Sequence, residues 1–81
     1  MNTPWKQPVL IAFEEPGVYT SIETTQAASW AMIEDWPEED GEALDYALLV
    51  CAAVDMGKKK PEDARKAFVA AAIEAGLDVK A

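Results

Sequence analysis

The 81-residue sequence contains no histidine and only one cysteine, Cys51. Without histidine no Ser-His-Asp arrangement can form, and a zinc or iron site lacks its usual ligands. A single cysteine excludes an intrachain disulfide and gives no indication of an oxidising compartment. Cys51 itself lies on an apolar helical row, which is typical of a buried structural thiol. We therefore expect no catalytic residue, no cofactor and no enzymatic activity.

Glycine-rich stretches and long apolar runs are also missing. The four glycines, Gly17, Gly41, Gly57 and Gly76, stand singly at predicted turns and helix ends, which excludes a phosphate-binding loop. The apolar run near the N-terminus, Val9–Phe13, is too short for the core of a signal peptide, and no run is long enough to cross a membrane. We therefore expect a cytoplasmic protein without a membrane partner.

Basic residues are scarce, with 7 against 15 acidic residues and a net charge of −8. Nucleic acids and anionic membranes both require a basic face, so neither is an expected partner. The charge is uneven, because six of the seven basic residues lie after Gly57. This asymmetry is consistent with charges that complement one another within the chain or with association between chains, but a solvated surface is the commoner explanation and the one we favour.

The pattern of elements predicts one small domain, residues 1–81, of the α+β class. Pro8–Phe13 and Val18–Ile22 are rich in strand-forming residues, and the Pro16-Gly17 pair between them fits a type II turn. Three helical stretches follow, ending near Trp36, Met56 and Gly76 in turn. The predicted fold is an N-terminal β-hairpin packed against three α-helices, in the order β-β-α-α-α.

Helix-end signals refine this prediction. Ser21 or Thr24 can cap the first helix, and Asp40 can cap the second. Leu77 can fold back over Ala72 in a Schellman-type end to the third helix. The second helix should bury one apolar stripe: Leu44, Ala47, Leu48, Cys51 and Val54. Because 15 residues are alanine, the core should depend on the large apolar side chains Trp5, Leu10, Phe13, Trp30, Trp36, Leu44, Leu48, Phe68 and Leu77.

Seven carboxylates stand between Glu34 and Tyr46 without a basic residue. An EF-hand alignment fails, because placing Asp40 at position five puts tryptophan at position one. A loose site for a divalent cation, using Glu38, Asp40 and Glu42, remains as the alternative. We favour the interpretation that these carboxylates serve the end of one helix and the start of the next, where negative charge is favourable.

The chain as a whole resembles the Domain of Unknown Function 982 family of small bacterial proteins, from about Trp5 to Leu77. The resemblance rests on core and helix-end residues: Pro8-Val9, Ser21, Ala27-Ala28, Trp36-Pro37, Gly41, Ala47, Cys51, Gly57, Ala64-Arg65, Ala67-Phe68, Ala71-Ala72 and Ala75-Gly76. It implies a compact α+β domain with no assigned activity, substrate or cofactor. No functional residue is carried over from it.

Function is predicted only in outline: a non-enzymatic protein-interaction or regulatory module that binds itself or another protein. A two-stranded hairpin leaves two sheet edges unpaired, so a homodimer formed through a sheet edge is one expected form. Leu10, Ala12 and Trp5 are its expected interface residues. The alternative is weak binding of a divalent cation or a basic peptide by the acidic cluster Glu38–Asp45.

Overall fold

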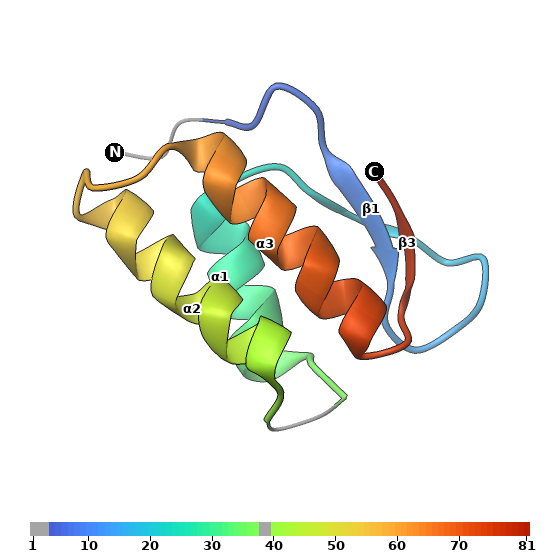
Figure 1. The fold of residues 1–81 in the computed structure, drawn as a ribbon. Coiled ribbons are helices and arrows are strands. Elements are labelled where there is room, and N and C mark those ends of the chain that lie inside the picture. The colour runs from blue at the N-terminus through green and yellow to red at the C-terminus, as the bar shows by residue number, and fades with distance from the viewer. Residues whose placement is uncertain (1–3, 38–39) are drawn as a thin grey trace.

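The computed structural model describes residues 4–37 and 40–81, and it confirms the α+β class. The three helices pack on one side of a small sheet (Figure 1). The elements in chain order are β1 Val9–Ala12, β2 Thr20–Ile22, α1 Thr25–Glu34, α2 Glu42–Asp55, α3 Pro61–Glu74 and β3 Asp78–Lys80. The predicted hairpin and helices are all present. The C-terminal strand β3 was not predicted.

Strand β1 lies in the middle of an antiparallel sheet of order β2-β1-β3. Ile11 is opposite Thr20 on one side and Val79 on the other. Val9 and Ile11 are fully buried, which places their face of β1 against the helices. The edges of β1 are therefore covered by two neighbouring strands of the same chain, and the free edges of the sheet belong to β2 and β3.

The outer face of the sheet is covered in part by Tyr19. Its hydroxyl donates a hydrogen bond to the Asp78 carboxylate, and Lys80 Nζ lies 4.5 Å from the centre of its ring. Tyr19 follows the last β1–β2 pair in register, so it lies opposite Ala12. This position explains why Ala12 is buried although it points away from the helices.

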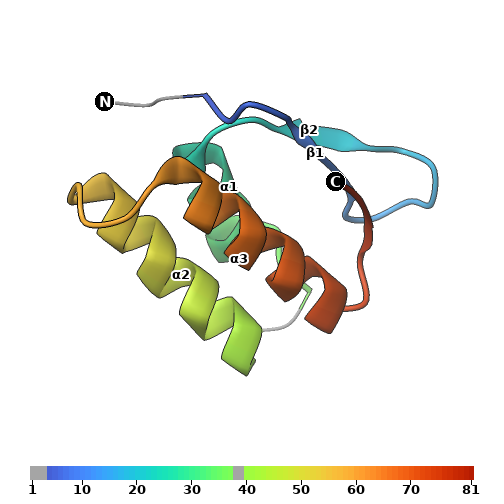
Figure 2. The same cartoon turned by 45° about the horizontal axis from the view of Figure 1, so that its top comes forward.

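The three helices form two layers below the sheet. In Figure 2, α1 and α3 lie beneath the strands, and α2 lies farthest from them. Phe68 of α3 is fully buried, and its ring centre lies 6.1 Å from that of Trp5 and 5.5 Å from that of Trp36. The core therefore combines an aromatic cluster under the sheet with small alanine contacts between the helices.

The prediction that Trp30 belongs to the core is wrong, because its side chain is 54% exposed. The buried residues of α1 are Thr25, Ala28, Ala31 and Met32. Helix α1 carries apolar residues on more than one face. The spacing of apolar residues along its sequence therefore did not decide which face packs against the other helices. The face with small side chains was selected because it allows close approach to the neighbouring helices.

Two of the three predicted helix ends are confirmed. The Thr24 side chain accepts a hydrogen bond from Ala27 N at 3.0 Å. At the end of α3, Leu77 N donates to Ala72 O at 3.0 Å, which completes the Schellman motif. The prediction for Asp40 is wrong: Gly41 takes the N-cap position of α2 and has no side chain to cap it.

The first turn of α2 is instead capped by a carboxylate from another helix. Glu74, the last residue of α3, accepts from Ala43 N at 3.0 Å and from Leu44 N at 3.3 Å. This cap satisfies two backbone donors that lack partners within α2. It also sets the end of α3 against the start of α2, which fixes the antiparallel packing of the two helices.

Candidate functional site

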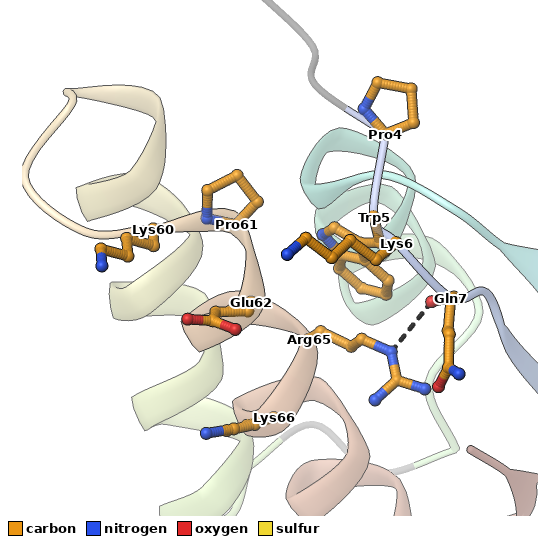
Figure 3. A pocket seen from close by; sticks show the side chains of 9 residues that line it. All are labelled: Pro4, Trp5, Lys6, Gln7, Lys60, Pro61, Glu62, Arg65 and Lys66. Atoms are coloured by element: carbon orange, nitrogen blue, oxygen red, sulfur yellow. Dashed lines mark hydrogen bonds between the residues drawn. The ribbon is translucent and has the colours of Figure 1, made fainter.

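A groove of about 610 Å³ opens where the segment preceding β1 passes the start of α3. Figure 3 shows its walls, with one side formed by the N-terminal segment and the other by the loop and first turns of α3. The lining residues are Pro4, Trp5, Lys6, Gln7, Lys60, Pro61, Glu62, Arg65 and Lys66. The two walls come from opposite ends of the sequence.

Trp5 fixes the N-terminal wall of the groove. Its backbone N–H donates to Glu23 O at 2.7 Å, and its indole Nε1 donates to Thr25 Oγ1 at 3.2 Å. Because both polar groups of Trp5 have partners, the ring can be buried against Phe68 without cost to hydrogen bonding. The anchored tryptophan is followed directly by Lys6 and Gln7, which belong to the same wall.

The opposite wall begins where α3 begins. Pro61 occupies the first helical position, where its missing N–H costs nothing. The Lys60 N–H donates to Asp63 Oδ2 at 3.1 Å, so the first turn is capped by a residue of its own helix. Lys66 lies one turn and a half beyond Pro61, on an exposed part of the same helix.

Arg65 joins the two walls. Its Nε donates to the backbone oxygen of Gln7 at 2.9 Å, as the dashed line in Figure 3 shows. Its Nη2 atom is buried and has no hydrogen-bond partner among the described residues. A buried N–H donor left without a partner costs roughly 1–3 kcal/mol, so this guanidinium favours an acceptor that can reach it. A carboxylate is a suitable acceptor, because hydrogen bonds between charged partners are stronger than those between neutral ones.

The charge of the groove is opposite to that of the whole chain. Four of its nine lining residues are basic, namely Lys6, Lys60, Arg65 and Lys66, and one, Glu62, is acidic. These four are more than half of the seven basic residues in a chain of net charge −8. The fold therefore gathers scattered cations into one concave surface, where the field at the floor is stronger than at a flat surface.

The three interface residues predicted from the sequence do not form one surface. Trp5 and Ala12 are buried within the chain, and Leu10 is half-buried on the outer face of the sheet. Trp5 does line the groove, although most of its side chain is buried. The reasoning from a two-stranded hairpin was incomplete, since β3 covers an edge of β1 that was expected to be free.

The predicted acidic site is only partly described. Glu38 lies outside the described residues, and Asp40 and Glu42 are exposed. Within residues 4–37 and 40–81, no group of three or more acidic or cysteine side chains is arranged to hold a metal ion. The only cysteine, Cys51, is buried, and this burial raises its pKa, while a hydrogen bond with Ser29 opposes the rise in part and the charge of Asp55 adds to it. A thiol in this state is protonated at neutral pH and is a poor nucleophile.

The groove was not predicted, although part of its signal is present in the sequence. Lys58, Lys59 and Lys60 follow Gly57 in the basic part of the chain, and the first two are exposed outside the groove. The concentration of basic residues after Gly57 pointed to this end of the chain. Lys6 and Gln7 gave no signal, because only tertiary structure brings them beside α3.

Fold and site together define a small α+β domain with a basic groove. The family model described as "Protein of unknown function (DUF982)" matches residues 7–79, so the chain belongs to this family. No curated protein and no solved structure matched the chain. Among the described helices, none has both the length and the apolar character needed to span a membrane.

Proposed function

We propose that this protein is a non-enzymatic interaction module that binds an acidic segment of a partner protein in the groove between Trp5 and Arg65. The observation that carries the proposal is the reversal of charge: a groove with four basic residues and one acidic residue in a chain of net charge −8. Basic side chains that serve no shared binding site would be distributed over the surface of such a chain. Here they line one concavity.

An acidic peptide fits this groove better than a nucleic acid does. The long-range field of a chain with net charge −8 repels an extended polyanion, while a short segment with a few carboxylates feels mainly the local cations within a Debye length of about 8 Å. The groove also presents the apolar surfaces of Pro4, Trp5 and Pro61, on which the aliphatic parts of a peptide can pack.

The expected roles follow from side-chain chemistry. The Arg65 guanidinium is held in place by Gln7 and supplies a fixed positive charge beside the groove. Lys6, Lys60 and Lys66 are flexible point charges that raise the rate of encounter and accept varied positions of the ligand.

The first prediction is tested by titrating the protein with a short polyglutamate peptide while following backbone amide chemical shifts. We expect saturable shifts at Lys6, Gln7 and Arg65, because these residues border the groove. Replacing Lys66→Glu should weaken binding by about tenfold, since it reverses a charge at the groove wall. Raising the salt concentration should weaken binding further.

The matched control is Lys80→Glu, which makes the same charge change on the outer face of the sheet, beside Tyr19, at a residue that does not line the groove. It should change the affinity by less than about twofold. Equal weakening by both replacements would show that only the net charge matters and would contradict a groove. Shifts that fail to saturate, or that centre on other residues, would overturn the proposed function. Inorganic phosphate in place of the peptide shows whether one small anion is sufficient.

A further inference from the structure

Helix α2 carries a second apolar stripe, separate from the one that it buries. For the stripe that α2 was predicted to bury, the structure confirms that Leu44, Ala47 and Cys51 are buried. On the opposite side, Tyr46 is 58% exposed, Leu49 70% and Met56 64%. These residues, with the partly buried Ala53 between the last two, are spaced by three, four and three positions, which places them in one row along the helix.

This row is unusual for the molecule. Among the described residues, α1 has two large exposed apolar side chains, Trp30 and Ile33, and α3 has one, Ile73. The α2 row extends from Tyr46 to the C-cap residue Met56, ten positions farther along the chain, and is spaced like the seam of a coiled coil. Figure 2 shows α2 on the side of the helical layer away from the sheet, so the sheet does not cover this row.

The charges at the two ends of α2 indicate what can cover the row. The first turn holds the exposed acids Glu42 and Asp45, and the helix is followed by the exposed cations Lys58, Lys59 and Lys60. Two α2 helices placed side by side and antiparallel would bring the acidic start of each beside the basic end of the other. A parallel arrangement would place like charges together and is therefore disfavoured.

We propose that two copies of this chain associate through α2, antiparallel and related by a twofold axis. Placing the axis at the middle of the row sets Tyr46 against Met56 of the second copy, and Leu49 against Ala53 of the second copy. Each contact is then made twice, as a twofold interface requires. Large side chains face small or flexible ones, which allows the helices to approach closely.

This association is independent of the groove. The groove is formed by the N-terminal segment and the start of α3, and of its lining residues only Lys60 also belongs to the cationic end of α2. The seam is one helix from each copy and is smaller than a standard protein interface. We therefore expect a reversible dimer with a Kd on the order of 10–100 µM.

Sedimentation equilibrium of the full chain over a range of concentrations tests this inference. Leu49→Glu should raise the dimer Kd by at least tenfold, because it places a charge at the centre of an apolar seam. Ile73→Glu is the control, since it makes the same change at a residue of similar exposure on α3 and should leave the Kd unchanged. Both side chains are exposed, so both variants should keep the wild-type melting curve.

A charge exchange tests the direction of pairing. Glu42→Lys and Lys58→Glu should each weaken the dimer, and the double variant Glu42→Lys with Lys58→Glu should associate more strongly than either single variant. A wild-type chain that stays monomeric at the highest soluble concentration would overturn the inference. So would a dimer that survives Leu49→Glu, or a double variant weaker than both single ones, and each of these results leaves the groove titration unaffected.

Discussion

The start of α2 depends on a contact between two residues that are distant in sequence, Gly41 and Glu74. The Glu74 carboxylate lies over the first turn of α2, and a Cβ atom added at Gly41 would collide with its Oε1. The absence of a side chain at Gly41 therefore makes room for the carboxylate that caps Ala43 and Leu44. Here glycine is required by a close approach and not only by its backbone freedom.

Gly41→Ala should accordingly destabilise the protein by roughly 1–3 kcal/mol, because it forces the cap away from the helix end. Glu74→Ala should cost about 0.5–2 kcal/mol, the usual range for losing an N-cap. Urea denaturation of both single variants and the double variant measures their coupling. In the Glu74→Ala background, the alanine at position 41 should cost less than in the wild type, because the collision is gone.

Gly17→Ala provides the control for backbone effects in this comparison. Gly17 has a φ of +83°, but nothing lies within 4 Å of an added Cβ, so its replacement reports the left-handed conformation alone. If Gly41→Ala lowers the free energy of unfolding by the same amount with and without the Glu74 side chain, the close approach of Glu74 to Gly41 is not the cause of the destabilisation.

At the scale of the element, strand β3 is held on the sheet by side chains as well as by its backbone. Asp78 and Lys80 both reach Tyr19, which precedes β2 on the far side of β1. The three residues thus join the two outer strands across the central one. This connection also shields Ala12, so the sheet needs no second chain to cover that residue.

The pKa of Tyr19 reports this connection. The hydrogen bond to Asp78 is the main cause that raises it above the ordinary value of 10.0, with smaller contributions from desolvation and from the Asp78 charge. The pKa of Tyr19 is higher in the folded state than in the unfolded state. The contribution of the Tyr19–Asp78 hydrogen bond to the stability of the fold is therefore fully present below pH 10, and it is lost as the pH rises through the folded-state pKa.

A titration of the Tyr19 ring carbons by NMR, in a Tyr46→Phe background that leaves one tyrosine, measures this pKa directly. We expect a midpoint above 10 in the parent and a lower midpoint after Asp78→Ala. Identical midpoints in the two proteins would show that the contact between the strands does not form in solution.

At the scale of the whole molecule, the core is small and rich in alanine, and Cys51 lies inside it. Its thiol is buried on the side of α2 that faces the other helices, and its raised pKa keeps it protonated near neutrality. A thiol-specific reagent can therefore reach it only when the domain opens.

We expect native Cys51 to react slowly and its rate to rise with urea in parallel with the unfolding measured by circular dichroism. A variant carrying Cys51→Ala and Ala52→Cys moves the thiol to an exposed position on the same helix and should react at once. Fast labelling of the wild type without urea would show that α2 separates from the core on its own.

Much of the fold follows from local signals in the sequence. The turn at Pro16-Gly17, the cap at Thr24, the proline that begins α3 and the Schellman end at Gly76 depend on residues near one another, and each is present in the structure. Local hydrogen bonds and restricted dihedral angles act whatever the rest of the chain does. These signals predicted the order of elements and the α+β class, which the structure confirms.

The rest was decided by tertiary structure, because it depends on residues far apart in the chain. Strand β3 is a strand only because β1 offers it an edge, and Arg65 meets Gln7 across 58 positions to form the groove. The cap of α2 comes from Glu74, 31 positions beyond Ala43, and not from the carboxylates next to it. Local sequence determined the order of the elements and most of the helix ends. Packing determined which faces are buried, which residue caps α2 and where the basic side chains gather.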